Sequence, residues 1–373
     1  MRIGIDARCL EWERGGVARI LVNLLRLWPQ ISDRHQYMLY FESRVPEDEF
    51  LRHPLFEHRI INGPWFLKKR RSLAMQLFMP LEMRPHNLDL FFAPVYYGPL
   101  LSPCPKTVVG AWDISYTSHQ EHFKRRESMQ MSFFSRHSCR RAVGILTCSP
   151  FDARQIQRYY GIPSERICVL RLAADAKFTP TVDLQRLEVL RRKYRLPPRY
   201  ILSMGVILNR RSVDVIIDSF KNVYRDYADI GLVVVGRNST VPFVDIEGKM
   251  KPLIEEGRGV YLPRVTEDEL IDFYRGAWYY ICTSTVDGEA LMLKEAMKCG
   301  TPIITSPLLE ETVGGAAVIV LDPTSRDETG GVFCRIILDY ELRERLASGG
   351  LQWVQSLSWE SVARESLRFI ESR

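Results

Sequence analysis

Apolar runs and amphipathic segments alternate along the chain, and the whole alternation occurs twice. In the first half, short apolar runs predict strands, and apolar residues at helical spacing over 17–28 predict a helix. Such runs are typical of parallel strands that are buried on both faces between layers of helices. The strands predicted in the first half are residues 2–6, 37–41, 88–93, 107–111, 144–148 and 168–172.

Near the end of the first half, local residues signal where a helix begins and ends. Ser149 is placed to cap a helix that runs to residue 160, and Gly161, followed by Pro163, ends it. The polar segment around residues 179–181 predicts a linker, followed by a short charged helix at 184–194. The second series then predicts strands at 200–204, 231–235, 260–262, 279–283, 302–305 and 317–320, and helices at 213–227, 267–275, 293–298 and 359–370.

A chain of 373 residues is too long for one compact core and suits two α/β domains. We expect two doubly wound parallel sheets in tandem, with ligands in the crevice at the carboxyl ends of the strands. The cleft between the domains is therefore the predicted site. The predicted divisions are an N-terminal acceptor-side domain at 1–180, a linker at 181–198, a nucleotide-sugar-binding domain at 199–355 and a C-terminal helix at 356–373.

Composition narrows the class of protein. Hydrophobic residues make up 46% and charged residues 26%, which are globular values. No apolar run reaches the roughly 18 residues that span a bilayer, and the first residues predict a strand rather than a signal peptide. The eight cysteines lack metal-ligand spacing, so we expect free thiols, no structural zinc and a cytoplasmic location.

The net charge of +6 is unevenly distributed. Residues 1–180 carry 26 Lys and Arg against 17 Asp and Glu, and residues 181–373 carry 25 against 28. Basic residues gather at 68–71, at 124–126 and at Arg136, Arg140 and Arg141. This excess fits an anionic membrane surface, a phosphate-bearing acceptor, or a solvated helix face without a partner. Nucleic acid is not expected, because aromatic residues do not alternate with the basic ones.

The stretch from Ser284 to Met297 carries the strongest candidate chemistry. It predicts a strand, a turn of small residues and a helix, with Asp287 in the turn and Glu295 two turns into the helix. Free N–H groups and the dipole at a helix start favour anions such as a diphosphate. The other interpretation is an ordinary strand–turn–helix with solvated acids.

Segments along nearly the whole chain share their order and spacing with one family. They are residues 2–8 with 15–19, 145–151, 160–167, the paired acids of 287–295, then 296–302 and 358–360. Together they resemble the retaining GT-B-fold glycosyltransferases of family 4, in particular the mannosyltransferase-like bacterial branch. The resemblance implies two Rossmann-like domains facing a cleft, with the C-terminal helix packing back towards the N-domain.

The resemblance also implies an activity. The expected reaction moves a sugar, with mannose from a GDP-sugar favoured, from a nucleotide diphosphate-sugar to an acceptor hydroxyl with retained anomeric configuration. No metal or cofactor beyond the nucleotide-sugar is expected, so fixed positive groups must neutralise the departing diphosphate. The expected acceptor is a saccharide or lipid-linked intermediate of surface polysaccharide, lipopolysaccharide or glycolipid synthesis. Peripheral contact with the inner face of the membrane accompanies this expectation.

The family motif assigns roles residue by residue. Arg211, preceded by Arg210, is expected at the diphosphate, where a guanidinium binds two oxygens at once. Asp287 is expected at the transferred sugar and Glu295 at the ribose hydroxyls. Asp113 is expected to orient an acceptor or sugar hydroxyl, and Trp112 either stacks on a sugar or forms an apolar wall. The remaining donor-binding residues are expected to be Gly15, Gly16, Arg264, Val265, Gly288, Glu289, Ala290, Leu291 and Glu311.

Several positions depart from the family pattern. Trp112 stands where a histidine is usual, Ser212 where Gly or Asn is usual, and Ala290 where a glycine is usual. Glu289 adds a negative charge close to the expected phosphate pocket. These changes support an alternative, a catalytically weak or inactive paralogue that acts as a partner subunit. A nucleotide-sugar epimerase of related fold is a third interpretation, but we find no acid–base pair for it.

Overall fold

The computed structural model describes residues 1–11, 15–61, 71–227, 229–288 and 290–373, with the backbone alone for 71–74. The chain forms two compact units. Unit 1 comprises Met1–Gln120, Arg125–Leu172 and Ser358–Arg373, and unit 2 comprises Glu121–Lys124 and Ala173–Leu357. The end of the chain therefore returns to unit 1.

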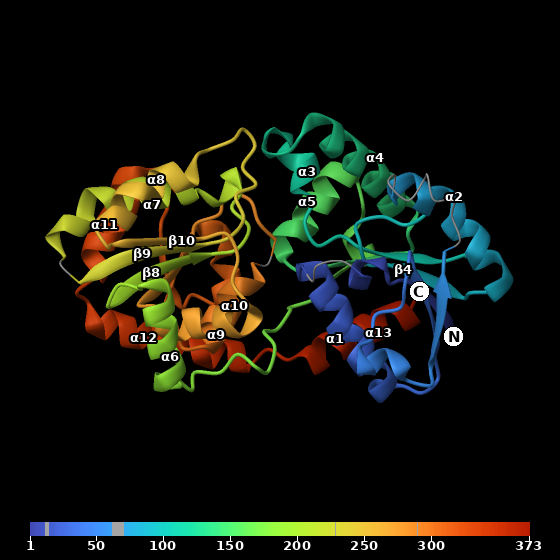
Figure 1. The fold of residues 1–373 in the computed structure, drawn as a ribbon. Helices are drawn as coiled ribbons and strands as arrows, with labels where there is room; N and C mark the ends of the chain where they lie inside the picture. Colours follow the sequence, from blue (N-terminus) through green and yellow to red (C-terminus); the bar gives the residue numbers. More distant parts are fainter. Residues whose placement is uncertain (12–14, 62–70, 228, 289) are drawn as a thin grey trace. The chain divides into compact units, whose positions relative to one another are not determined.

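Unit 1 is built on a seven-stranded parallel sheet in the order β3-β2-β1-β4-β5-β6-β7 (Figure 1). Its central strands are buried apolar runs, as expected for a sheet covered on both faces. The strands are β1 (Arg2–Asp6), β2 (Gln36–Phe41), β3 (Phe56–Ile60), β4 (Leu90–Ala93), β5 (Thr107–Gly110), β6 (Gly144–Thr147) and β7 (Ile167–Val169).

Contacts of individual residues explain where helices of unit 1 begin, end and pack. Ser149 accepts a hydrogen bond from the N–H of Asp152 at the start of α5, and Gly161 ends that helix with φ +69°. The final helix, α13, packs on α1, and Trp28 donates its indole N–H to the carbonyl of Ala363 at 3.2 Å. The helices are α1 (Gly16–Ile31), α2 (Arg71–Met83), α3 (Ser115–Ser118), α4 (Arg125–Arg141), α5 (Pro150–Tyr160) and α13 (Trp359–Glu371).

Unit 2 contains a six-stranded parallel sheet in the order β10-β9-β8-β11-β12-β13. Its strands are β8 (Arg199–Met204), β9 (Ile230–Val235), β10 (Gly259–Leu262), β11 (Tyr279–Cys282), β12 (Ile303–Thr305) and β13 (Ala317–Ile319). Its helices are α6 (Leu184–Tyr194), α7 (Val213–Val223), α8 (Ile246–Glu255), α9 (Glu267–Gly276), α10 (Leu291–Lys298), α11 (Arg326–Ile336) and α12 (Tyr340–Gln355).

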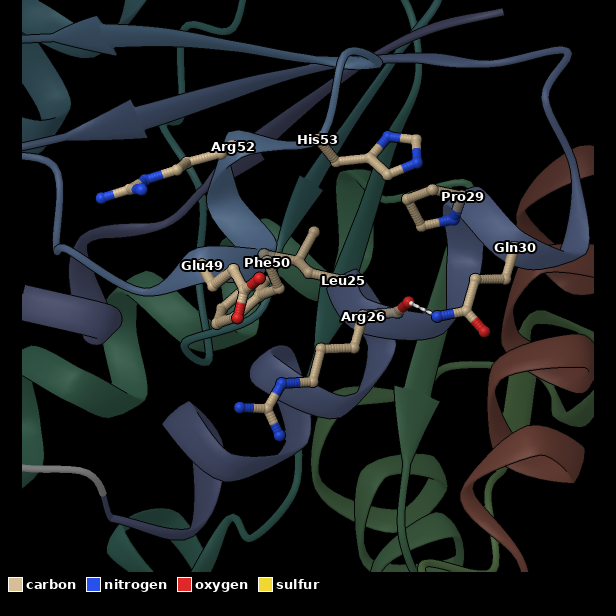
Figure 2. Close-up of a pocket in the computed structure, with 8 residues that line it drawn as sticks. All are labelled: Leu25, Arg26, Pro29, Gln30, Glu49, Phe50, Arg52 and His53. Carbon is tan, nitrogen blue, oxygen red and sulfur yellow. Dashed lines mark hydrogen bonds between the residues drawn. The ribbon is translucent and has the colours of Figure 1, made fainter.

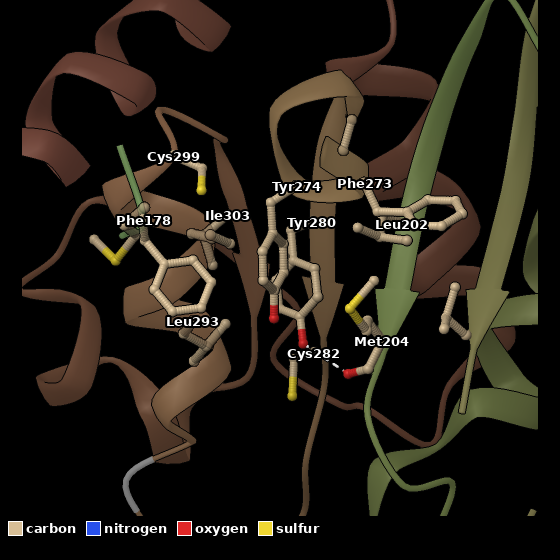
Figure 3. Close-up of a cluster of buried hydrophobic side chains, with 14 of the residues drawn as sticks. Phe178, Leu202, Met204, Phe273, Tyr274, Tyr280, Cys282, Leu293, Cys299 and Ile303 are labelled. Atoms are coloured by element: carbon tan, nitrogen blue, oxygen red, sulfur yellow. Dashed lines mark hydrogen bonds between the residues drawn. The ribbon is translucent and has the colours of Figure 1, made fainter. Parts of the chain in front are cut away.

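Helices cover both faces of this second sheet, with α7, α8 and α11 on one side and α9, α10 and α12 on the other (Figure 1). One apolar core lies under each set. Figure 3 shows the core beneath α9 and α10, where the rings of Tyr274 and Tyr280 lie 5.4 Å apart and Leu293 of α10 packs nearby. This core holds the start of α10 against the ends of the central strands.

The predicted fold class is confirmed: both units are doubly wound parallel sheets, and the C-terminal helix packs on the N-terminal unit. The predicted strands and helices are present, with ends that differ by a few residues. The pattern missed β3, α2, α3, α4, α8, α11 and α12. Among the described residues, no helix is both long enough and apolar enough to cross a bilayer.

Candidate functional site

The site predicted in unit 2 lies where the strand order reverses. The chain proceeds from β8 to β9 on one side and from β11 to β12 on the other, and β8 and β11 are neighbours. Loops that leave the carboxyl ends of such neighbours diverge, which opens a crevice between them. The turn that carries Arg210 and Arg211 follows β8, and the turn that carries Asp287 follows β11.

Short backbone contacts shape the arginine turn. Gly205 has φ +121°, and Arg210 and Arg211 belong to a single 3-10 turn that leads into α7. The carbonyl of Arg210 accepts hydrogen bonds from the backbone N–H of Thr285 at 2.8 Å and from its hydroxyl at 3.2 Å. This double contact ties the arginine turn to the acid-bearing turn, although 75 residues separate them in the sequence.

Asp287 and the two arginines form a buried ionic cluster. Arg211 donates its Nε–H to Oδ2 of Asp287 at 3.2 Å, and its Nη2 lies 3.1 Å from the same oxygen. Nη2 of Arg210 lies 3.9 Å from Oδ1. The hydroxyl of Ser284 donates to Oδ2 at 3.1 Å, and the N–H of Gly288 donates to Oδ1 at 3.0 Å. The cluster joins two residues that the sequence assigned to different parts of the donor.

The electrostatics of the cluster favour its charged form. Burial by itself would raise the pKa of Asp287, but Arg211, Arg210 and the Ser284 hydroxyl hold that pKa below its usual value. Burial likewise opposes the charge of Arg211, and the Asp287 carboxylate outweighs it and raises the pKa of the guanidinium. Both groups therefore remain ionised throughout the neutral range.

The start of α10 supplies backbone donors beside this cluster. Ala290 precedes the helix with φ +41° and ψ +62°, in the left-handed region that favours glycine, and Leu291 is the first helical residue. Ser212, before α7, has φ +49°. Both positions where this chain lacks the family's usual small flexible residue therefore have left-handed backbone. Glu289 lies outside the described residues.

Glu295 is in the second turn of α10, as predicted, and its side chain is buried at 3% exposure. Its Oε2 accepts a hydrogen bond from the hydroxyl of Tyr274 at 3.3 Å. Tyr274 and Ser284 are contacts of the paired acids that the sequence reasoning did not single out. Ser284 stands three residues before Asp287, a spacing that would have suggested the contact, whereas Tyr274 comes from α9 and left no local signal.

The other residues predicted in unit 2 lie on separate loops. Arg264 is exposed after β10, and Val265 packs against the core beneath α9 and α10. Glu311 begins a 3-10 turn after β12, with an exposed side chain. Gly288 is buried directly after Asp287. The structure thus brings Arg210, Arg211 and Asp287 together and places Arg264, Val265 and Glu311 on other connections of the same sheet.

Four predicted residues belong to unit 1. Gly15 precedes α1, Gly16 begins it, and a Cβ on either would meet no described atom within 4 Å. Trp112 is only 4% exposed, and its indole N–H donates to the carbonyl of Pro94 at 2.7 Å. This burial suits an apolar wall better than a stacking platform.

The carboxylate of Asp113 accepts from the N–H of Ser115 at 2.7 Å and from its hydroxyl at 3.0 Å. These bonds stabilise the start of α3. They also fix the orientation of the carboxylate, which is a requirement for the predicted contact with a hydroxyl group.

A separate pocket of about 690 Å³ lies in unit 1, between α1 and the 3-10 turn Glu49–Arg52 (Figure 2). Arg26 lies over the ring of Phe50, with its guanidinium carbon 5.2 Å from the ring centre. None of the predicted site residues lines this pocket, so it does not mark the same site. Within the described ranges, no three His, Cys, Asp or Glu residues are grouped as metal ligands.

Comparison with known proteins agrees with the fold and the motifs. A family profile described as "Glycosyl transferases group 1" matches residues 188–353, and one described as "Glycosyltransferase Family 4" matches residues 14–178. The O-antigen chain mannosyltransferase B of Escherichia coli is 26% identical over 283 residues, which are 73% of this chain and 73% of that protein.

Two solved structures share the fold. WaaG, a glycosyltransferase involved in lipopolysaccharide biosynthesis, aligns with a TM-score of 0.74 at 15% identity over 98% of both chains. Anabaena Alr3699/HepE in complex with UDP and glucose aligns with a TM-score of 0.72 at 15% identity over 100% of both chains. At this identity the likeness concerns the fold alone.

The fold and the profile matches together define a glycosyltransferase of the GT-B class. The two profiles account for both halves of the chain, and a mannosyltransferase is among the similar proteins. The chain belongs to the family 4 glycosyltransferases.

Proposed function

We propose that this glycosyltransferase moves a hexose from a nucleotide diphosphate-sugar to an acceptor hydroxyl and retains the anomeric configuration. The observation that carries the proposal is the ionic cluster of Arg210, Arg211 and Asp287 at the switch point of unit 2, beside the start of α10. Crevices at switch points hold nucleotides in open α/β sheets. Two guanidinium groups and a helix start are suited to a diphosphate.

The chemistry of the proposed step requires positive charge at the departing diphosphate. Negative charge develops on the phosphate oxygen as its bond to the sugar breaks, and preorganised cations stabilise that charge. Arg211 and Arg210 fill this role in the proposal, which therefore needs no metal. Asp287 holds Arg211 in place before the donor binds, and it shares the guanidinium with the diphosphate afterwards. We also assign Asp287 to the transferred sugar.

Other contacts complete the proposed donor site. Gly288, Glu289, Ala290 and Leu291 would contact the phosphates or the sugar through their backbone. Glu295 would accept from the ribose hydroxyls, on condition that the bond to Tyr274 at 3.3 Å is shared or broken. We assign Arg264 and Val265 to the nucleobase and Glu311 to the donor side.

Mannose from a GDP-sugar is the proposed donor, and a surface polysaccharide or glycolipid is the proposed product. The similar mannosyltransferase acts in O-antigen chain synthesis by its name, and the similar structure with UDP and glucose supports a nucleotide donor in this fold. Gly15 and Gly16 of unit 1 are assigned to the donor, and Trp112 and Asp113 to the acceptor or the transferred sugar. Residues 1–180 contain 26 basic and 17 acidic residues. This excess of positive charge supports a lipid-linked acceptor and peripheral association with an anionic membrane.

The inactive partner subunit is not favoured. The departures at Ser212 and Ala290 keep the left-handed backbone that the turns require, and both arginines remain in the crevice. A subunit without donor binding would have no need of two buried arginines joined to one carboxylate, because an apolar cluster of equal volume is as stable or more so.

Calorimetry with GDP, UDP and ADP tests the proposal. Binding is expected, and Arg211→Ala should weaken it at least about tenfold, or about 1.4 kcal/mol. Arg211→Lys keeps the positive charge but cannot bind two oxygens at once, so its affinity should lie between those of the native chain and Arg211→Ala. Arg345→Ala, an exposed arginine of α12, is the control and should bind as the native chain does. If none of the three nucleotides binds at millimolar concentration, the partner-subunit interpretation replaces this proposal.

A further inference from the structure

Unit 1 carries a group of large apolar side chains that are exposed to solvent. On α2, Leu77 is 50% and Leu81 is 53% exposed, and on α4, Met129 is 58% and Phe133 is 51% exposed. In each helix the two residues are four positions apart, so they share one face. Leu101, in the loop after β4, is 77% exposed. We refer to these five residues as the α2–α4 face.

Hydrogen bonds place the three segments side by side. The carbonyl of Gly98 accepts from the side-chain amide of Gln76 in α2 at 3.2 Å and from the hydroxyl of Ser138 in α4 at 3.1 Å. Leu100 is also bonded to both helices: its N–H donates to the side-chain oxygen of Gln76 at 2.7 Å, and its carbonyl accepts from the guanidinium of Arg141 at 2.9 Å. The loop that exposes Leu101 therefore lies between the two helices, and we treat the five side chains as one surface of unit 1.

The buried side of α4 is unusually polar for a surface helix of a globular protein. Its buried residues are Ser128, Ser135, Ser138 and Cys139. The hydroxyl of Ser128 donates to the carbonyl of Tyr116 at 2.6 Å, and the hydroxyl of Tyr116 donates to Ser135 at 2.7 Å. An amphipathic helix normally buries its large apolar residues and exposes its hydroxyls. In α4 the inner side carries hydroxyls, and the outer side carries Met129 and Phe133 among charged residues, which is suited to a partner that offers an apolar surface.

The charge of the same helix indicates the kind of partner. Arg125, Arg126, Arg136, Arg140 and Arg141 are all exposed on α4, against one acidic residue in the helix, Glu127. The guanidinium groups of Arg140 and Arg141 each donate to a backbone carbonyl, which leaves their positive charge uncompensated by those contacts. Apolar side chains surrounded by arginines fit a surface that offers phosphates first and hydrocarbon beneath them.

We infer that the α2–α4 face docks unit 1 on an anionic lipid bilayer, with Leu77, Leu81, Met129 and Phe133 entering the boundary between headgroups and acyl chains. The α4 arginines lie at the lipid phosphates. This inference rests on the membrane association proposed above and specifies its surface and its mode, insertion rather than adhesion by charge alone. It does not depend on which sugar is transferred. Lys68, Lys69 and Arg70, which the sequence also assigned to the basic excess, lie outside the described residues.

Flotation of the full chain with vesicles tests the inference. Vesicles of phosphatidylcholine with phosphatidylglycerol should bind the protein, and vesicles of phosphatidylcholine alone should bind it much more weakly. The double variant Met129→Ser, Phe133→Ser should lose at least about tenfold in partitioning. The control, Leu184→Ser with Val189→Ser, removes side chains on α6 of unit 2 that are 75% and 65% exposed, and should float like the native chain.

A second readout separates insertion from adhesion. Tryptophan in place of Phe133 should be quenched by brominated acyl chains, whereas tryptophan in place of Phe243, which is 75% exposed in unit 2, should not be. Salt screens adhesion by charge, because the Debye length falls to about 3 Å at 1 M, and it leaves insertion largely intact. If Met129→Ser, Phe133→Ser floats like the native chain while Arg136→Ser, Arg140→Ser does not, insertion is wrong.

Two further results would overturn the inference. The first is the absence of flotation at low salt on any anionic vesicle. The second is a dimer in sedimentation velocity that the Met129 and Phe133 variant dissolves, since a second copy would then cover this face. Nucleotide binding by calorimetry is measured on each variant. A variant that loses flotation and keeps nucleotide binding separates failure of docking from failure of the proposed transfer.

Discussion

Asp287→Asn is the substitution that tests the ionic cluster most directly. Asparagine has nearly the same shape and keeps one acceptor oxygen, but it removes the negative charge that Arg211 approaches at 3.1 Å and Arg210 at 3.9 Å. The side chains of both arginines are about nine-tenths buried, with 9% exposure for Arg210 and 12% for Arg211. The variant therefore leaves two buried cations without their carboxylate.

The expected loss follows from that burial. Removing one partner of a buried ion pair costs about 3–5 kcal/mol. The lower end applies here, because Arg211 keeps its hydrogen bond to the carbonyl of Val206 at 3.2 Å. For a unit of this size, 1 kcal/mol shifts the Tm by about 2–4 °C, so a loss of about 3 kcal/mol lowers the Tm of unit 2 by about 6–12 °C. Unit 1 has no part in the cluster, and its unfolding should not move.

Differential scanning calorimetry measures this shift, with Asp226→Asn, an exposed aspartate of the same unit, as the control. Added GDP should stabilise the variant more than the native chain, since the diphosphate supplies the missing negative charge. The reasoning is refuted if Asp287→Asn unfolds within about 1 °C of the native chain, or if Asp226→Asn shifts as far.

The stability of the native chain and that of Asp287→Asn should also depend differently on pH, and the sign of this difference follows from the pKa of Asp287. Burial would raise the pKa of Asp287, but Arg211 and Arg210 lower it below its value in the unfolded chain. A depressed pKa contributes stability that is fully present above the ordinary pKa of about 4, and that is lost as the pH falls below it. The difference in unfolding free energy between the native chain and Asp287→Asn should therefore be constant at neutral pH and shrink in acid.

Two further predictions concern the turns of the site. Ala290→Gly should stabilise unit 2 by about 1 kcal/mol in chemical denaturation, because φ at this position is +41°. Ala296→Gly, inside the helix that follows, should destabilise the unit by at least as much. Gly205→Ala should weaken nucleotide binding about tenfold in calorimetry, because a Cβ there would lie 2.6 Å from Nη1 of Arg211; Gly257→Ala, at φ +69° in open space, should leave binding unchanged.

Local signals predicted the elements that depend on local causes. The helix α5 was predicted with its cap at Ser149 and its end at Gly161, because both the hydroxyl bond and the left-handed glycine are properties of neighbouring residues. The buried strands were predicted because a short run of apolar residues is typical of a parallel strand that helices cover on both faces. Two parallel-sheet domains followed from repetition of that pattern.

The pattern failed where burial did not require apolar residues. The helix α4 was missed because its inner face is made of serines, whose hydroxyls are satisfied only by residues of other segments such as Tyr116. The strand β3 was missed because it lies at the edge of its sheet, where three of its five residues, including His58 and Arg59, are polar. Hydrophobic periodicity carries no information about either situation.

The sequence alone determined which residues are available to a nucleotide diphosphate-sugar: two arginines after one strand, and two acids in and after the turn that follows a later strand. It did not reveal that Arg211 and Asp287, 76 positions apart, bind each other directly. That contact exists because β11 inserts beside β8 rather than beside β10. Strand order is set by the packing of whole layers, and only the tertiary structure can bring such distant charges within 3.2 Å.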